Sequence, residues 1–495
     1  MQTLHRPLAA VILLYVLAPL AALAQTADRW YIVEMMGGKA GWMHTFDLET
    51  DTTITTTSKT HFSLARGGAG LSITIESEFV EGKDGKPISM KAVQKLGKNE
   101  IISEYTFTPE GIRLKSTQEG ETTERTLPNP EGTWLAPAAA ERYVQQRYKS
   151  GAKEITVRTM DPSNGPGVVT AVRTGFEPEK LTIEGRELDV VKTMVEMSVM
   201  PGAKSTEYID AEGELVKSRT LVGGLAVTMT RATREEATAE AEGPSPEVMT
   251  STFIYPDKPI ENPRQVKQAV LILSVPDEPL PEVPATGAQR VEKIDATTLR
   301  LTIRADAFDP APEAETKDTA YLAATTMCDS NDEQVKRLAA LALQAVGDDK
   351  AKRAEMLRRF VHLHINKKNL NVGFASASEV ARDRAGDCSE HGVLLAALLR
   401  ADGIPARVVS GLVYADGFAG AKQIFGYHMW AQALLAIDGT PRWVDLDATL
   451  PALTPFDATH ITLGTSALAE GDLTSGMVSV AGAMGRLKIK VESVK

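Results

Sequence analysis

Cysteine is scarce in this chain, with two residues, Cys328 and Cys388, among 495. A framework of several disulfides, which stabilises many small secreted domains, is therefore excluded. One disulfide between these two cysteines is an alternative, and a thiol with a chemical role is the other. The sequence around Cys388, described below, favours the thiol.

Positive charge is also in short supply. Lys and Arg total 54 against 65 Asp and Glu, which gives a formal net charge of −11. Nucleic-acid binding needs clustered Lys and Arg to neutralise phosphates, so the composition argues against a nucleic-acid partner. A hydrophobic content of 43% is ordinary for a chain that buries a core. The length predicts two or three folding units.

Long apolar runs are missing except at the N-terminus. Residues 8–23 are apolar, follow His5 and Arg6, and lead into the small-x-small sequence Ala22-Leu23-Ala24 that signal peptidase reads. This pattern predicts a signal peptide at residues 1–24, cleaved near Ala24, and export to the periplasm or the extracellular space. An uncleaved anchor is the alternative, although the run is shorter than the ~20 residues that a spanning helix needs. No integral membrane span is predicted in the mature chain.

Residues 25–233 alternate apolar and polar side chains over short stretches, as half-buried antiparallel strands do. The clearest run is residues 71–79, and turn dipeptides such as Asp84-Gly85 separate the stretches. One helix is expected at residues 137–148, since proline suits a first helical position. These features predict a mostly antiparallel β domain. We find no catalytic constellation in it.

Residues 234–319 are interpreted as a linker, rich in Glu and Ala at its start, followed by β segments that lead into the C-terminal domain. From residue 320 the apolar period becomes helical. The expected elements are strands at 268–275 and 298–303 and helices at 334–346 and 350–365. The last domain is therefore residues 320–495, and the predicted fold class is α+β.

Cys388 stands at the start of a strong helical pattern. Residues 393–399 are apolar, and Asp402-Gly403 ends the pattern. Cys388 is therefore expected in the first turn of a buried helix with Asp387 as its N-cap, where free N–H groups and the helix dipole favour a thiolate. The same N–H groups are natural oxyanion donors. An isolated buried cysteine is more often a small hydrophobic residue, so a nearby base is the decisive feature.

His428 is predicted on one strand of a β-hairpin. Residues 427–435 alternate like a strand, Asp438-Gly439 makes the turn, and residues 442–447 return. Pairing outward from this two-residue turn makes Asp447 the diagonal neighbour of His428, with about 7 Å between their Cβ atoms. The side chains are then within reach of one another.

Asp445 shares this face but lies about 13 Å from His428 along the strand, so the geometry prefers Asp447. The chosen residues fit a nucleophile, base and orienter. Cys388 supplies the sulfur. His428 holds it as a thiolate and later protonates the leaving amine, and Asp447 fixes the imidazole tautomer.

Four sequence blocks around these residues resemble the bacterial transglutaminase-like superfamily. They are Gly386-Asp-Cys-Ser-Glu-His391, Gly403-Ile-Pro-Ala-Arg-Val-Val-Ser-Gly411, Tyr427-His-Met-Trp430 and Trp443-Val-Asp-Leu-Asp-Ala-Thr449. The resemblance covers residues 333–464 and implies a papain-like domain, in which a helix carrying Cys packs on an antiparallel sheet carrying His and Asp. It implies that Cys388, His428 and Asp447 form a catalytic triad. The implied chemistry is transamidation, deamidation or hydrolysis of protein or peptide amides through a thioester.

The resemblance has limits. Animal-type members have Trp beside the Cys, where this chain has Ser389, and nothing resembles their calcium sites. No cofactor is therefore expected. The second oxyanion donor is not identified in the sequence, so hydrolysis stays as open as crosslinking.

Four residues near the triad are expected to have supporting roles. Asp387 caps the helix, and Trp430 is the aromatic residue that follows the family histidine by two. Glu390 and His391 are expected to form a buried polar brace. His391 is also a rival base, since it lies three residues after Cys388 on the same helix face.

Two alternatives concern the same residues. Cys388, His391, His428 and Asp447 are ligand types that suit zinc, but a thiol enzyme explains them without metal, so no metal is predicted. In the second alternative, the domain is a catalytically silent interaction module in the cell envelope. Silent members of the family usually lose a triad residue, however, and all three are present here.

The predicted partners are a protein or peptide substrate and a cell-envelope protein bound through the N-terminal β domain. In the assembly-factor alternative that domain binds its partner and the thiol domain only docks. A large exposed apolar patch on the β domain would favour this alternative.

Overall fold

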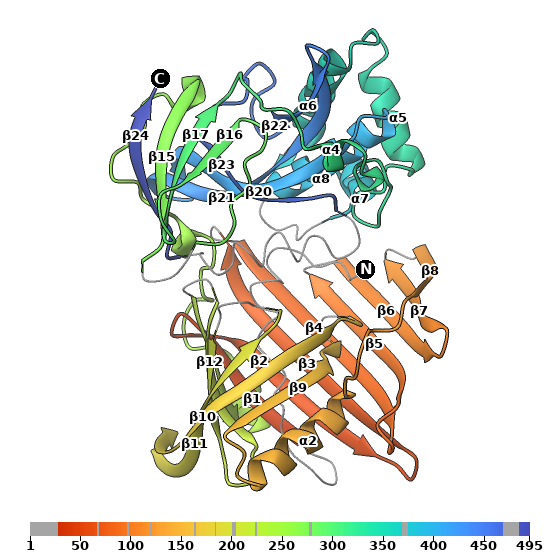
Figure 1. Ribbon diagram of the computed structural model, residues 1–495, viewed down its shortest axis with the longest axis vertical. Coiled ribbons are helices and arrows are strands. Elements are labelled where there is room, and N and C mark those ends of the chain that lie inside the picture. Colours follow the sequence, from red (N-terminus) through yellow and green to blue (C-terminus); the bar gives the residue numbers. More distant parts are fainter. Residues whose placement is uncertain are drawn as a thin grey trace. The chain divides into compact units, whose positions relative to one another are not determined.

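The computed structural model describes residues 28–66, 69–96, 99–118, 121–162, 165–183, 185–199, 204–222, 225–276, 280–368, 375–468 and 485–495. The predicted signal peptide lies outside these residues. Of the described residues, 50% lie in strands and 19% in helices, so the fold is α+β, as predicted. The chain divides into an N-terminal unit that reaches Glu247 and a C-terminal unit that begins at Val248 (Figure 1). Within the described ranges no helix is long and apolar enough to cross a membrane.

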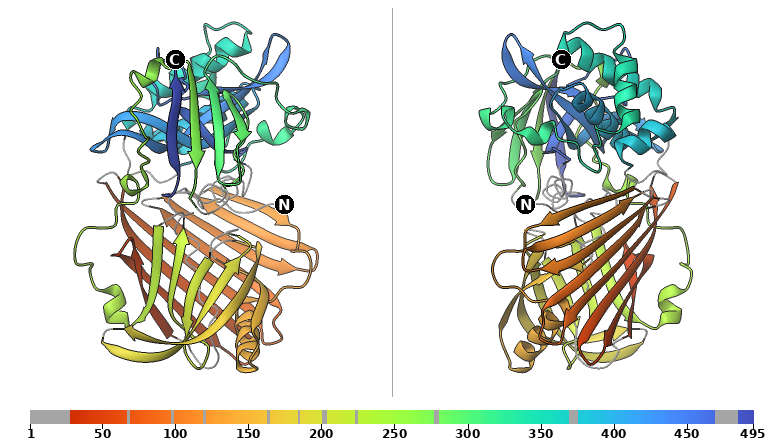
Figure 2. Two further views of the ribbon diagram at one scale, coloured as in Figure 1. Left: turned by 60° about the vertical axis from the view of Figure 1, so that its left-hand side comes forward. Right: turned by 90° about the vertical axis from the view of Figure 1, so that its right-hand side faces the viewer.

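The N-terminal unit is built on one antiparallel sheet of 14 strands, in the order β8-β7-β6-β5-β4-β3-β2-β1-β14-β13-β12-β11-β10-β9. The sheet curves strongly (Figure 2), and Leu135, beyond one end strand, bridges Thr159 on the other. The strands are β1 (Asp28–Met35), β2 (Gly38–Glu49), β3 (Thr53–Arg66), β4 (Ala69–Gly82), β5 (Pro87–Leu96), β6 (Asn99–Thr108), β7 (Gly111–Gln118), β8 (Glu121–Leu127), β9 (Glu154–Met160), β10 (Val168–Ile183), β11 (Arg186–Met197), β12 (Lys204–Ile209), β13 (Leu215–Val222) and β14 (Leu225–Ala232). Their alternating burial is the predicted half-buried pattern.

Helix α2 (Pro137–Lys149) is the predicted helix of this unit, and its N-terminus is capped from a strand. Ala136, at the N-cap, offers no side-chain acceptor. Glu81 of β4 replaces it, since its carboxylate accepts hydrogen bonds from the N–H groups of Ala138 and Ala139 at 2.9 and 3.0 Å. This carboxylate is 1% exposed. Its loss would leave donors unsatisfied in the core.

Replacing Glu81 with alanine should lower the free energy of unfolding by about 1–3 kcal/mol, because one buried and one part-buried N–H group would lose their acceptor. Urea denaturation followed by circular dichroism measures the change. Glu78→Ala is the matched control, since Glu78 is an exposed residue of the same strand. An equal effect of the two substitutions would contradict the capping role.

The C-terminal unit contains two four-stranded antiparallel sheets and a group of helices. One sheet has the order β22-β21-β20-β23 and the other β16-β17-β15-β24. The strands are β15 (Gln268–Ser274), β16 (Gln289–Lys293), β17 (Thr298–Arg304), β20 (Ala406–Phe418), β21 (Ala421–Ile437), β22 (Thr440–Leu446), β23 (His460–Ser466) and β24 (Lys488–Val494), with the short pair β18 (Lys367–Lys368) and β19 (Ala385–Gly386). Helix α8 (Cys388–Ala401) packs on β20 and β21.

The other described helices range from one turn to the 15 residues of α6. They are α3 (Arg234–Thr238), α4 (Glu313–Thr316), α5 (Glu333–Ala342), α6 (Lys350–His364) and α7 (Ala377–Asp383), with 3₁₀ turns η2 (Thr250–Thr252), η3 (Pro263–Gln265) and η4 (Thr319–Tyr321). Helices α5 and α6 lie where helices at 334–346 and 350–365 were predicted.

The segment predicted as a linker with leading strands is organised differently. Its first residues form α3, in the N-terminal unit. Strands β15 and β17 pair with one another and belong to the C-terminal unit, where β15 also pairs with the distant β24. Their apolar side chains share a core with β20 and β23. These strands therefore form a layer of the C-terminal unit rather than a lead-in to it.

The start of α8 has the predicted geometry. The Asp387 carboxylate accepts a hydrogen bond from Ser389 N at 2.9 Å, and the Glu390 carboxylate accepts one from Asp387 N at 2.8 Å. In this capping box, each of the two side chains accepts a hydrogen bond from a backbone N–H at the start of α8. Gly386 precedes it with φ of +146°, and an added Cβ there would collide with Glu390. The local sequence therefore fixes where the helix begins and places Cys388 in its first turn.

The hairpin of β21 and β22 has the predicted register. Asp438 and Gly439 form the turn with φ of 50° and 75°, as a type I′ turn requires. Gln432 pairs with Asp445 in the ladder. On the other side of β21, Gly411 of β20 pairs with His428.

Candidate active site

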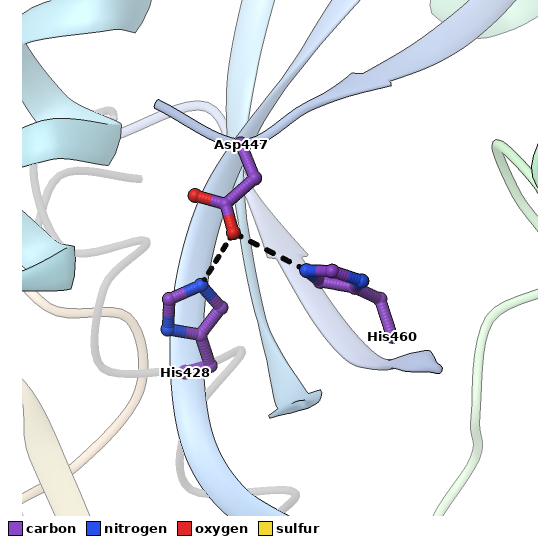
Figure 3. A group of neighbouring side chains, drawn as sticks. All are labelled: His428, Asp447 and His460. Carbon is purple, nitrogen blue, oxygen red and sulfur yellow. Dashed lines mark hydrogen bonds and ion pairs between the residues drawn. The ribbon is translucent and has the colours of Figure 1, made fainter. Parts of the chain in front are cut away.

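His428 and Asp447 meet at the end of this hairpin. His428 Nε2 lies 2.8 Å from Asp447 Oδ2, and the side chains are 11% and 1% exposed. Thr449 donates to the other carboxylate oxygen from its backbone N–H and its hydroxyl at 2.8 and 2.7 Å. Figure 3 shows the His428 ring pointing one nitrogen at Asp447. The carboxylate is thus held by donors on both oxygens.

The charge on this pair follows from its surroundings. Burial lowers the pKa of His428, but the Asp447 charge and hydrogen bond, together with the neighbouring Cys388, raise it to about 9. Burial also acts to raise the pKa of Asp447, and His428 brings it well below its usual range. The pair is therefore an imidazolium and a carboxylate at neutral pH. Since Nε2 faces Asp447, Nδ1 is the nitrogen left for Cys388.

The cysteines occupy different environments. Cys388 is half-buried at the start of α8, whereas Cys328 is fully buried, and both are free. Burial raises the pKa of Cys328 to about 11, so its thiol stays protonated at neutral pH. Because both thiols are free, the structure does not contain the disulfide of the alternative interpretation. Cys388 is the thiol that lies beside an imidazolium.

Glu390 and His391 are buried beneath the helix entrance, in the place of the predicted brace. His391 Nδ1 lies 2.5 Å from the Asp387 carbonyl oxygen and must donate to it. Burial lowers the pKa of His391 to about 4, so its ring is neutral. Burial and the Asp387 charge raise the pKa of Glu390 to about 8. Both side chains form hydrogen bonds with the backbone of Asp387, at the start of α8.

Asp445 and Trp430 form a separate structural contact. The Asp445 carboxylate accepts hydrogen bonds from Trp430 Nε1, Gln432 Nε2 and Ala288 N, each at 2.8 Å. The Trp430 ring stacks near His428, with 6.0 Å between ring centroids. The Asp445 carboxylate is thus occupied by structural hydrogen bonds. Trp430 packs beside the His428 imidazole.

His460 is a neighbour of Asp447 to which the sequence analysis assigned no role. Its Nε2 lies 3.2 Å from Asp447 Oδ2, on the opposite side from His428 (Figure 3). It comes from β23, which follows β22 after a long irregular connection. No turn of known length fixes that register, so the sequence holds no local signal for this contact.

Metal ligation was considered for Cys388, His391, His428 and Asp447, but the structure groups a different set. Among the described residues, His428, Asp447 and His460 form a group with metal-ligand spacing, their ligand atoms lying within 4.8 Å of one another. Both imidazoles direct a nitrogen at one carboxylate oxygen. Two hydrogen bonds to a shared acceptor account for this arrangement.

The two histidines should make stability depend on pH. Each has a pKa of about 9 against 6.5 for an ordinary histidine, so each favours the folded state fully below pH 6.5 and loses that contribution as pH rises through about 9. The melting temperature should therefore decrease as the pH is raised from 6.5 to about 9.5. Differential scanning calorimetry measures it.

Asp447→Asn is the comparison for this titration. It removes the carboxylate that helps to raise both histidine pKa values but leaves Glu390, whose titration has the same sign, in place. The variant should show a flatter pH dependence than the wild type. Parallel curves would mean that the histidines contribute nothing.

Residues 311–448 match the family model of the transglutaminase-like superfamily. The C-terminal unit therefore contains a transglutaminase-like domain, as the sequence resemblance predicted. A search of curated proteins gave no match.

Solved structures give distant likenesses of the fold. A β-barrel-like protein of a domain of unknown function from Brucella abortus is 11% identical, with 43% of this chain and 98% of that chain covered and a TM-score of 0.34. A putative cysteine protease from Cytophaga hutchinsonii is 16% identical, with 45% and 85% covered and a TM-score of 0.28. The periplasmic domain of TgpA from Pseudomonas aeruginosa, bound to ethylmercury, is 18% identical, with 40% and 87% covered and a TM-score of 0.28.

Proposed function

We propose that the protein is a thiol-dependent acyltransferase or hydrolase acting on protein or peptide amides, with Cys388, His428 and Asp447 as its triad. The observation that carries the proposal is the buried His428–Asp447 pair, 2.8 Å apart, with Cys388 close enough to contribute to the His428 pKa. This is the order of groups that a thiolate nucleophile needs.

The reaction begins when the Cys388 thiolate attacks the carbonyl carbon of the amide. His428 then gives its proton to the leaving nitrogen as the C–N bond breaks, which releases ammonia or an amine and leaves a thioester. Water or an amine attacks the thioester carbonyl and passes its proton to His428. The C–S bond breaks, the acid or new amide leaves, and the thiolate–imidazolium pair is restored.

The oxyanion of each tetrahedral intermediate needs donors. The capping box occupies the N–H groups of Ser389 and Glu390, because both donate to the Asp387 side chain. The N–H of Cys388 itself is therefore the donor that we assign to the start of α8. A second donor is not assigned.

The setting of this activity follows from the sequence. The leader-like residues 1–24 favour work outside the cytoplasm, in the periplasm or the extracellular space. The N-terminal unit is the part that we propose contacts a cell-envelope partner. Where the chain is described, this unit has six exposed large hydrophobic side chains, which lie on several elements. They are Met36, Leu48, Ile88, Tyr143, Leu188 and Leu221.

Capture of the thioester tests the function. The purified protein is incubated with glutamine-containing peptides and with unfolded casein, with and without a primary amine, and Cys388 is searched for an acyl adduct by mass spectrometry. Adducts on the wild type and on Cys328→Ser, but not on Cys388→Ser, are expected. Ammonia release, amine incorporation or peptide cleavage identifies the outcome. No adduct, together with an unreactive Cys388, would leave the silent interaction module as the function.

A further inference from the structure

Both nitrogens of the His460 ring face acceptors. Nε2 lies 3.2 Å from Asp447 Oδ2, and Nδ1 lies 3.1 Å from the Asp457 carbonyl oxygen and 3.4 Å from Asp457 Oδ1. A carbonyl oxygen has no proton to give, and an ionised carboxylate has none either. Only a ring protonated on both nitrogens satisfies all of these contacts. The surroundings therefore require an imidazolium.

Contacts of Asp457 with residues other than His460 keep its carboxylate ionised. Its carboxylate lies 2.8 Å from Arg264 Nη1 and accepts hydrogen bonds from Thr459 N and Oγ1 at 2.9 and 2.5 Å. Burial acts to raise the pKa of Asp457, and His460 and Arg264 bring it below its usual value. Positive and negative charges thus alternate in space from Arg264 through Asp457 and His460 to Asp447.

His460 is enclosed so that its charge acts strongly. The side chain is fully buried, with the Phe456 ring 4.3 Å and the Trp430 ring 5.3 Å away between centroids. A charge on a fully buried side chain is screened little by solvent. The titratable and charged groups that face it, directly or through Asp457, are Asp447, Asp457, His428, Asp445 and Arg264.

We propose that His460 is a positioning residue for the triad: a charged imidazolium that holds Asp447 toward His428 and offsets part of the Asp447 charge. This inference rests on the proposed function and extends the triad by His460, Asp457 and Arg264. Figure 3 shows its central feature, one carboxylate oxygen shared by two imidazoles.

The offset has a chemical consequence. An uncompensated Asp447 beside His428 in a buried site would hold the His428 proton more tightly, because attraction between buried charges is strong. His428 must release that proton to the leaving nitrogen. A second cation on the same carboxylate weakens the hold, so proton transfer becomes easier without removal of the orienting hydrogen bond.

The protonation state of His460 is measured in the wild type by long-range ¹H–¹⁵N spectra of protein labelled at histidine. We expect His460 to show two protonated nitrogens at pH 7. A singly protonated ring at that pH would overturn the proposal. This measurement needs no variant and does not depend on catalysis.

The effect on His428 is measured with His460→Gln, which keeps an amide donor but removes the charge. Iodoacetate is attracted to the His428 imidazolium, so its reaction with Cys388 slows when that proton is lost. The basic limb of this reaction should move up by about one pH unit in His460→Gln, since removing a nearby cation raises the His428 pKa. An unmoved limb would overturn the proposal.

Two further variants separate charge from folding. Asp457→Asn, which weakens the anion that holds His460 charged, should shift the limb in the same direction by less. His44→Gln is the matched control, because His44 forms a 2.7 Å pair with Asp28 in the N-terminal unit, and should leave the limb unchanged. If His460→Gln does not fold, the wild-type spectra and Asp457→Asn decide. An unreactive wild-type Cys388 would instead refute the proposed function.

Discussion

Replacing His428 with alanine should slow the alkylation of Cys388 by iodoacetamide at pH 6 by about 100-fold. A cysteine without a cationic partner titrates near ~8.5, so well under ~1% of it is thiolate at pH 6. In the wild type, the His428 imidazolium, with a pKa of about 9, remains charged at that pH and stabilises the thiolate. The rate is followed by mass spectrometry of the peptide that contains Cys388.

The pH profile makes this result specific. The wild type should react faster than His428→Ala wherever the His428 imidazolium is charged, below about pH 9, and the difference should shrink above it. His44→Ala controls for the loss of an imidazole elsewhere and should keep the wild-type profile. Equal profiles for the wild type and His428→Ala would show that no ion pair forms, and the proposed triad would fail.

Asp447→Asn should reduce turnover by about 10³–10⁴-fold, the size of effect seen when a triad carboxylate is neutralised. The variant keeps the shape of the side chain but loses the charge that raises the His428 pKa. Its ion pair should therefore be lost at a lower pH. The basic limb of iodoacetate alkylation should fall by one unit or more, and turnover is measured on the amide that yields the acyl adduct.

Asp445→Asn is the matched control for this substitution. Asp445 is a buried aspartate on the same face of the hairpin, but its partners are Trp430, Gln432 and the Ala288 backbone. Its loss should lower stability and leave the basic limb near the wild-type position. If both variants moved the limb equally, the effect would come from general damage to the sheet rather than from the triad.

The parts of the site that sequence reasoning reached are those set by local chemistry. The Asp387 cap begins α8, and a two-residue turn at Asp438 and Gly439 fixes the β21–β22 register. Side chains alternate along a strand, so the register alone predicted which aspartate lies beside His428. The local pattern also indicated strand β4, at residues 71–79, and the helix α2.

Long-range pairings were beyond the same reasoning. Strand β1 pairs with β14, and β15 pairs with β24, across most of a unit in each case. Neither pairing is joined by a turn, so hydrophobic pattern gives the strands but not their partners. The contact of His460 was unpredictable for the same reason, since a long connection brings β23 to its place beside β20. The charges behind Asp447 became visible only when these strands were assembled.

The hairpin turn at Asp438 and Gly439 also determines which genetic changes this site tolerates. An in-frame insertion that moved the β22 register by one residue would turn the Asp447 carboxylate to the opposite face of the sheet. Every residue of the proposed triad would still be encoded, yet the proposed site would be lost. Substitutions within the turn preserve this spacing. Among inherited variants, small in-frame insertions and deletions in this stretch should therefore be the rarest.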